Sequence, residues 1–518
     1  MNSGNRVGSI PFFARKLILI TLILLVTVPV RPSPIQHARL KLVVQVSELS
    51  NLIYQLDCLS GFANCSQNSY LHLWRSTLDW SAEDQSQLEQ WRLLRAKYHG
   101  PITLNRPQFQ PANLPWNGPT GLQLEEKFSI AAFHAVDEKS LSTHWEVIVA
   151  PTDLPRLESI VGHFQARFSR WWSQQAQEKA EGFRGDLQNR LQEEPIQSLL
   201  ESFARFYGAD FPDEFSVYLN LFFRPPGEDT HSNATMIENQ AVIEFIPGED
   251  VNRRLTVVIH ELCHFLYSSS ADSQKQRLIS AFANSKAPLS LAGWGLLNEA
   301  LATALGNGIA GESLLDSATY NTELQTERSF YNDAAIDAAA KALIPFLKTQ
   351  ISERKTLYDS NFVGTYLITL ENKIPALLMM PARLFTEVTI VYESEFGDAF
   401  RHEIRPQLSG GIYPFEGLEN GNSWVMHERY PKLNAMVVVS PKTLPVLKRF
   451  EKWVPQADFR SMEQASEGGG PWVYAVQRFP STYLFIICGQ SNQDISTGFS
   501  RLMKGKHRFT GFMLRSTK

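Results

Sequence analysis

One short segment restricts the possible folds of this 518-residue chain more than any other. His260 and His264 are four residues apart, and apolar residues precede and follow them, which predicts a helix packed into a core. Side chains four residues apart lie on the same face of a helix, so both imidazoles would point to one place. Because a buried polar group is costly without a partner, we expect these two histidines to share a ligand.

The residues between the two histidines indicate which ligand this is. Glu261 lies about 100° around the helix from His260, where its carboxylate would reach a water molecule beside a metal ion and take its proton. Zinc lowers the pKa of such a water molecule to about 7. The segment therefore predicts one Zn²⁺ ion bound by His260 and His264, with Glu261 as the general base. A structural helix without metal and a metal site without catalysis remain open, and Cys263 is either a packed thiol or a further ligand.

A third ligand is expected on a later helix, because a catalytic zinc ion usually has three protein ligands and one open position. Glu299 lies in the segment 293–308, whose apolar residues predict a buried helix. A lone buried carboxylate destabilises the folded state, and coordination to a metal removes that conflict. Glu299 is therefore the expected third ligand, with a salt bridge at the edge of the core as the alternative.

These residues together resemble the catalytic core of the gluzincins, the class of zinc metallopeptidases that contains the thermolysin-like and aminopeptidase N-like enzymes. His260, Glu261 and His264 match the HExxH helix of that class, and Asn298-Glu299-Ala300 matches its N-E-[AG] segment. The resemblance covers residues 215–306. It implies a zincin-like fold with one zinc ion, hydrolysis of peptide bonds, and a peptide or protein substrate bound along an edge strand before the motif helix.

The chain departs from the patterns of both subgroups. In thermolysin-like enzymes an aspartate four residues after the glutamate ligand supports a histidine, and Thr303 occupies the matching position here. We therefore expect support for that histidine from elsewhere in the chain. The GxMEN segment of the aminopeptidases is also absent upstream of the motif, which argues against a close aminopeptidase.

Enzymes of this class also use a Tyr or His to stabilise the tetrahedral oxyanion. Tyr366, on a predicted helix downstream of Glu299, is the first candidate for that role. Tyr320, Tyr331 and His402 are the alternatives. An ordinary core tyrosine with its hydroxyl at the edge of the apolar region is the competing interpretation of Tyr366.

The predicted elements around the motif include both strands and helices. Phe215–Phe223 and Ala241–Ile246 are predicted strands, and the second of them would be the edge strand that binds substrate. Asp250 is the predicted N-cap of the motif helix. Helical spacing is also expected over residues 40–100 and 289–373, the latter with helix ends at Gly306 and Gly308.

The fold class predicted from this order is α+β. We expect a mostly helical zincin-like catalytic core with a short mixed sheet, a helical N-terminal region and a small C-terminal α/β domain. The predicted boundaries are a signal peptide or N-terminal membrane anchor over 1–34, a mainly helical region over 35–210, a zincin-like metallopeptidase domain over 211–405, and an α/β domain over 406–518.

The N-terminus predicts export from the cytoplasm. Basic residues precede an apolar run at 17–30, which is short for a spanning helix and typical of a secretory leader. The protein is therefore expected to be periplasmic or otherwise extracytoplasmic, or membrane-anchored through this run, and a buried N-terminal helix is the alternative. In an oxidising compartment Cys58 and Cys65 could close a small loop, whereas Cys263 and Cys488 fall in apolar segments and are expected to be buried thiols.

Composition limits the remaining function classes. The net charge of −4 and the pI of about 6.3 lack the basic excess of nucleic-acid-binding proteins, so no nucleic-acid partner is expected. The predicted function is a zinc-dependent metallopeptidase. A noncatalytic zincin-like binding or scaffold protein of the cell envelope and a zinc hydrolase acting on a non-peptide amide are the alternatives, and the oligomeric state is not predicted.

Overall fold

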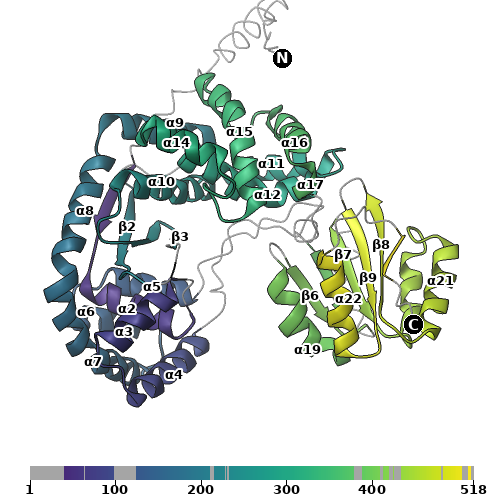
Figure 1. Ribbon diagram of the computed structural model, residues 1–518, viewed down its shortest axis with the longest axis horizontal. Helices are drawn as coiled ribbons and strands as arrows, with labels where there is room; N and C mark the ends of the chain where they lie inside the picture. Colours follow the sequence, from purple (N-terminus) through teal and green to yellow (C-terminus); the bar gives the residue numbers. More distant parts are fainter. Residues whose placement is uncertain are drawn as a thin grey trace, which may run out of the picture. The chain divides into compact units, whose positions relative to one another are not determined.

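The computed structural model describes residues 40–62, 65–98, 124–209, 215–227, 229, 233–378, 388–408, 412–418, 424, 433–479, 482–504 and 511–514. The expected leader at 1–34, with its apolar run, lies outside the described residues. The described chain is mixed α+β, as predicted, and consists of helices with two sheets (Figure 1). None of the described helices is long and apolar enough to cross a membrane.

Residues 40–378 are mostly helical and carry the shorter sheet. Its strands are β1 (Lys41–Gln45), β2 (Ser216–Phe223), β3 (Ala234–Ile237) and β4 (Gln240–Phe245). The helices before β2 are α2 (Glu48–Leu59), α3 (Gln67–Ser76), α4 (Ala82–Lys97), α5 (Leu124–Phe133), α6 (Glu138–Glu146), α7 (Leu154–Trp171), η1 (Trp172–Ala176), α8 (Gln177–Leu191) and α9 (Glu194–Tyr207). Those after β4 are α10 (Val251–Ser268), α11 (Asp272–Asn284), α12 (Ser290–Thr303), η2 (Ala304–Ala310), α13 (Gly311–Leu314), α14 (Ser317–Gln325), α15 (Ala334–Ser352), α16 (Phe362–Lys373) and α17 (Pro375–Leu378).

The four strands lie in the order β1-β2-β4-β3, with β1, β2 and β4 parallel and β3 antiparallel to β4. This order corrects two predictions. Lys41–Gln45 is a strand and not the start of a helix, because Leu42 and Val44 alternate into the core while the segment pairs with β2. The predicted edge strand, β4, lies inside the sheet between β2 and β3, and the edge strand on that side is β3.

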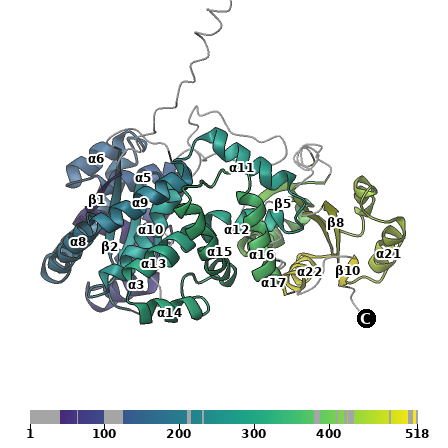
Figure 2. The same ribbon diagram turned by 90° about the horizontal axis from the view of Figure 1, so that it is seen from above.

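Each face of this sheet is covered by helices. Tyr54 of α2 and Phe133 of α5 pack with Phe222 and Val242 on one face. On the other face, the ring of Phe183 from α8 stacks on Phe245 of β4 at 4.6 Å between ring centroids. The motif helix α10 also packs beside β3 and β4, and seen from above α12 and α15 lie between α10 and α16 (Figure 2). The sheet and these helices therefore enclose α10 within one apolar core.

The second sheet belongs to the C-terminal part of the chain. Its strands lie in the order β10-β8-β9-β7-β5-β6, of which β6, β5, β7 and β9 are parallel. The strands are β5 (Val388–Tyr392), β6 (Ile412–Glu416), β7 (Asn434–Val439), β8 (Trp472–Phe479), β9 (Thr482–Cys488) and β10 (Gly511–Leu514). The helical segments are η3 (Ser394–Phe396), α19 (Gly397–Ala399), η4 (Phe400–Ile404), η5 (Arg405–Gln407), η6 (Leu444–Phe450), α21 (Gln456–Glu467) and α22 (Asn492–Lys504).

This arrangement confirms the α/β character predicted for the C-terminal region but not its boundary. The helical segment 394–407 and α22 cover one face of the sheet, whereas η6 and α21 cover the other. Because β5 lies inside this sheet, between β7 and β6, and residues 394–405 pack on one face of it, residues 388–405 belong with the C-terminal strands and not with the region that contains the motif helix. The boundary predicted at 405 is therefore wrong. The one predicted at 210 is crossed by the pairing of β1 with β2.

The cysteines are arranged as predicted. Cys58, near the end of α2, and Cys65, just before α3, form a disulfide with their Cα atoms 5.9 Å apart. Cys263 and Cys488 are buried free thiols. The disulfide therefore closes the connection between two helices of the N-terminal region.

Candidate metal centre

The motif helix α10 begins at its predicted N-cap. The side chain of Asp250 accepts a hydrogen bond from the backbone N–H of Asn252, which satisfies one of the free donors at the start of the helix. From there the helix carries His260 and His264 to the same face, and the structure confirms that their rings meet, with Nε2 of one 3.1 Å from Nε2 of the other. The apolar neighbours that predicted this helix are buried in the core.

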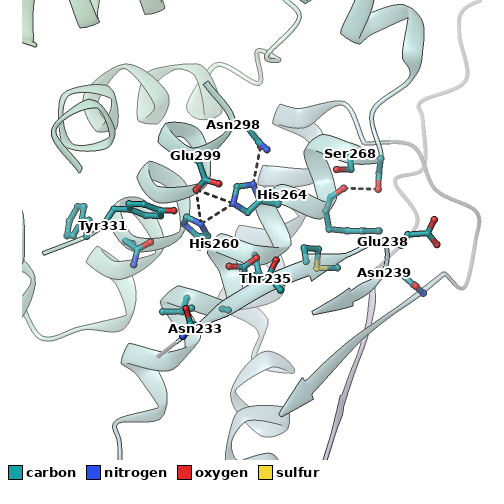
Figure 3. Close-up of a pocket in the computed structure, with 18 of the residues that line it drawn as sticks. Asn233, Thr235, Glu238, Asn239, His260, His264, Ser268, Asn298, Glu299 and Tyr331 are labelled. Carbon is teal, nitrogen blue, oxygen red and sulfur yellow. Dashed lines mark hydrogen bonds and ion pairs between the residues drawn. The ribbon is translucent and has the colours of Figure 1, made fainter. Parts of the chain in front are cut away.

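The helix α12 brings Glu299 to the two histidines, as predicted. Its Oε2 atom lies 3.6 Å from Nε2 of His260 and 3.5 Å from Nε2 of His264. This oxygen is buried, and it accepts no hydrogen bond from the described residues. The two imidazoles and the carboxylate thus face one point between α10 and α12 (Figure 3).

Two side chains of α12 and its C-terminal turn contact the outer nitrogens of the imidazoles. Oδ1 of Asn298 lies 3.1 Å from Nδ1 of His264, and Oγ1 of Thr303 lies 3.5 Å from Nδ1 of His260. The amide oxygen only accepts, so Nδ1 of His264 donates and its Nε2 keeps a lone pair. The expectation that support would come from elsewhere than Thr303 is therefore wrong for His260, because the Thr303 hydroxyl contacts Nδ1 of this ring.

The donor set fits a zinc ion. Ligand atoms of a tetrahedral site with bonds of about 2.0–2.2 Å are about 3.3–3.6 Å apart. The three separations observed, between 3.1 and 3.6 Å, lie around that value. Two imidazole nitrogens and a carboxylate oxygen at such distances repel one another unless a cation or a proton lies between them. The buried Oε2 atom of Glu299, which lacks a hydrogen-bond donor, is in the position where such a cation would bind.

The carboxylates of the site differ in their electrostatic surroundings. Burial alone would raise the pKa of Glu299, but its interactions with His260 and His264 outweigh burial and hold that pKa well below its usual range. Glu261 is 5% exposed, and burial raises its pKa above the usual value. The side chain of Glu261 forms no hydrogen bond or ion pair with the described residues, so its carboxylate is available as a proton acceptor.

The three candidate metal ligands line a cleft of about 1180 Å³. One side of the cleft is the edge strand β3, whose Ala234, Thr235 and Met236 line it, and the other is formed by α10 and α12. Among the described strands β3 pairs only with β4, so its outer edge faces away from the sheet. An extended chain could therefore lie along β3 beside the imidazoles.

The prediction that Tyr366 belongs to this site is wrong. Tyr366 is fully buried, its hydroxyl donates to the carbonyl of Gly293 at 2.8 Å, and it does not line the cleft. Tyr331 lines it instead, and its ring stacks on that of His260 with the centroids 5.9 Å apart. Of the other two candidates, Tyr320 is buried against Phe330 and His402 lies on η4, and neither lines the cleft.

Tyr331 is poised to donate a hydrogen bond. Burial, together with the negative charge of Glu299, raises the pKa of its phenol, so the hydroxyl keeps its proton at neutral pH. The residue lies just before the N-cap of α15, in a loop that sequence patterns do not connect with the motif helix. Only the folded structure shows that Tyr331, and not Tyr366, lines the cleft beside the imidazoles.

The sequence patterns also did not predict the close contact between α10 and η2. The predicted helix ends at Gly306 and Gly308 are wrong, because the chain continues from α12 through the π-helical turn η2 into α13. A Cβ atom at Gly306 would lie 2.6 Å from the backbone nitrogen of His260, so only glycine lets η2 approach α10 this closely. Cys263 is a packed thiol as the simpler interpretation had it, since burial raises its pKa and it does not line the cleft.

Comparisons of the chain with protein-family models, with curated proteins and with solved structures find no match.

Proposed function

We propose that this protein is a zinc-dependent metallopeptidase. The observation that supports this most strongly is the convergence of His260, His264 and the buried Oε2 oxygen of Glu299 on one point, in a cleft that Glu261 also lines. The carboxylate of Glu261 is buried beside these ligands and forms no hydrogen bond with the described residues. A purely structural metal site does not need such a group, so its presence argues against a noncatalytic scaffold. The open edge of β3 favours a peptide over a small amide as substrate.

Each residue has a defined task in this proposal. His260, His264 and Glu299 would hold the zinc ion, which when bound supplies Lewis-acid chemistry and a water molecule of lowered pKa. Glu261 accepts the proton of the attacking water and transfers it to the nitrogen of the leaving amine. The raised pKa of Glu261 brings it closer to the operating pH, which suits a group that must take up and then release a proton.

Substrate positioning falls to the walls of the cleft. The peptide would extend β3 as an additional strand, so that its backbone is held next to the imidazoles. The Tyr331 hydroxyl would donate a hydrogen bond to the carbonyl oxygen as negative charge develops there. Asn298 and Thr303 orient the two imidazoles through their Nδ1 atoms.

We also propose that the protein acts outside the cytoplasm. The disulfide between Cys58 and Cys65 supports this, since such bonds persist in oxidising compartments. The basic residues and apolar run at the N-terminus support it independently.

The test is metal analysis combined with proteome-wide cleavage profiling of the full chain purified in detergent. Wild type is expected to bind one zinc ion per chain and to cleave peptides. Glu261→Gln should keep the zinc ion and lose at least about 100-fold in kcat, whereas His264→Ala should lose the metal. Stoichiometric zinc in His264→Ala, or wild-type activity in Glu261→Gln, would overturn the proposal. Hydrolysis of small amides but of no peptide would favour the alternative of a non-peptide hydrolase.

A further inference from the structure

The cleft beside the proposed metal centre has an uneven distribution of charge. Five of the described residues that line it carry carboxylates, whereas no lysine or arginine is found among these lining residues. The carboxylates come from separate elements, namely Glu126 of α5, Glu238 of the β3–β4 turn, Glu261 of α10, Glu299 of α12 and Asp333 at the N-cap of α15. One divalent cation would offset two of these five formal charges, so carboxylates remain in excess among the lining residues with zinc bound.

Three of the cations on α10 and α11, namely Arg253, Arg254 and Lys275, do not line the cleft. Arg253 pairs with Glu323, and Arg254 pairs with Glu249 at 2.7 Å. Lys275 is buried, and its ammonium group donates to the backbone carbonyl of Ser268 at the end of α10. Lys275 does not line the cleft, so the carboxylates are the ionised side chains that an occupant meets there.

Glu238 is the carboxylate least explained by the fold. It is exposed, it forms no hydrogen bond with the described residues, and its backbone φ of 51° lies in the left-handed region, where Gly or Asn is the usual choice. In Figure 3, Thr235 of β3 lies next to the imidazoles and Glu238 lies at the end of that strand. At about 3.3 Å per residue, Glu238 is about three residues along an extended chain from the metal centre.

We propose that the cleft selects peptides with a lysine or arginine about three residues from the bond that is cut. This inference rests on the proposed peptidase function and adds the class of substrate to it. A cationic side chain would approach the carboxylate of Glu238 while the peptide backbone follows β3. The remaining negative charge of the cleft would attract such peptides and repel acidic ones.

The first test compares hydrolysis of matched peptides by the zinc-loaded full chain. The peptides differ only in carrying Lys, Gln or Glu at each position around the cut. We expect kcat/KM for the best Lys peptide to exceed that for its Glu twin by at least about 10-fold at low salt, and this ratio to shrink at high salt. Equal rates for the three peptides at every position would overturn the proposal.

Variants of Glu238 test whether this residue causes the preference for Lys peptides over Glu peptides. Glu238→Gln should reduce the Lys-over-Glu ratio of kcat/KM about 3-fold and Glu238→Lys about 10-fold. Glu158→Lys is the matched control, because Glu158 is an exposed residue of α7 that does not line the cleft. A ratio that persists in Glu238→Lys, or that falls equally in Glu158→Lys, contradicts a role for Glu238.

A binding measurement separates this inference from the proposed function. Fluorescence anisotropy with the Glu261→Gln protein reports peptide affinity without turnover, so it stands even if wild type cleaves no peptide. If wild type cleaves no peptide, tighter binding of the Lys peptide than of the Glu peptide would still support the charge selection, provided that Glu238→Lys abolishes this difference. If wild type cleaves peptides but the Lys and Glu peptides bind equally well, the peptidase proposal stands and the proposed selection by charge is overturned.

Discussion

Nδ1 of His264 donates a hydrogen bond to Oδ1 of Asn298 across 3.1 Å, although the two residues stand on different helices. This contact fixes the ring orientation and leaves the Nε2 lone pair toward Glu299. We expect Asn298→Ala to weaken zinc affinity about 10- to 100-fold, because the imidazole loses its orienting partner. Titration with a competing chelator measures this affinity directly.

The control for this variant is Asn332→Ala. Asn332 also lines the cleft, but among the described residues the hydrogen bonds to the Nδ1 atoms of the imidazoles come from Asn298 and Thr303 and not from Asn332. Its removal should leave zinc affinity unchanged. An equal loss of affinity in both variants would mean that Asn298 acts only through the general polarity of the cleft.

We expect the loss of the Tyr331 hydroxyl to impair catalysis and the loss of the Tyr366 hydroxyl to leave it unchanged. Tyr331→Phe should lower kcat about 100-fold with little change in KM, because its hydroxyl would bind the developing oxyanion and not the resting substrate. Tyr366→Phe should leave kcat unchanged and cost about 1 kcal/mol of stability, since it removes only the buried hydrogen bond to Gly293. Steady-state kinetics and urea unfolding of both variants check this pair. A larger loss of kcat in Tyr366→Phe would restore the residue that sequence patterns favoured.

Asp84 links stability to pH far from the cleft. Burial alone would raise its pKa, but hydrogen bonds from Arg167, the Ser81 backbone and His163 outweigh burial and lower the pKa to about 2. A pKa lowered by folding contributes stability above the unfolded value near 4, and this stability is lost as the pH falls toward 2. Asp84→Asn should therefore cost about 2 kcal/mol at pH 7.

Urea unfolding at several pH values tests this linkage. The difference between wild type and Asp84→Asn is expected to be nearly constant above about pH 5 and to narrow mainly between about pH 4 and pH 2, because the carboxylate of the unfolded chain takes up its proton at a higher pH than that of the folded protein. Glu158→Gln removes an exposed carboxylate and should show no such narrowing. A difference that is independent of pH would show that Asp84 stabilises the fold through its shape and not through its charge.

Sequence patterns predicted the parts of the site that depend on short-range spacing. His260 and His264 needed only the helical repeat, and Glu299 followed from the cost of a lone carboxylate among apolar neighbours. The strands β1 and β3 were missed, because each is short and is stabilised by pairing with a distant segment. The choice between Tyr331 and Tyr366 likewise depended on which tyrosine the tertiary fold brings to the imidazoles.

Gly306 illustrates a constraint that local patterns misassign. A glycine near the end of an apolar helix suggests a C-cap, but here it is needed because a Cβ atom would lie 2.6 Å from the backbone nitrogen of His260. Gly306→Ala should push η2 away from α10, destabilise the fold by about 1–3 kcal/mol and weaken zinc affinity together with it. Gly364→Ala is the matched control, because nothing lies within 4 Å of a Cβ atom there.

The two glycine variants should move stability in opposite directions. Gly364 lies inside α16, where alanine is the better helix former, so its replacement is expected to stabilise the protein by about 0.5–1 kcal/mol without changing zinc affinity. Thermal unfolding and chelator competition on both variants measure the two effects separately. If Gly306→Ala binds zinc as tightly as wild type, the close approach of η2 serves packing alone and does not position His260.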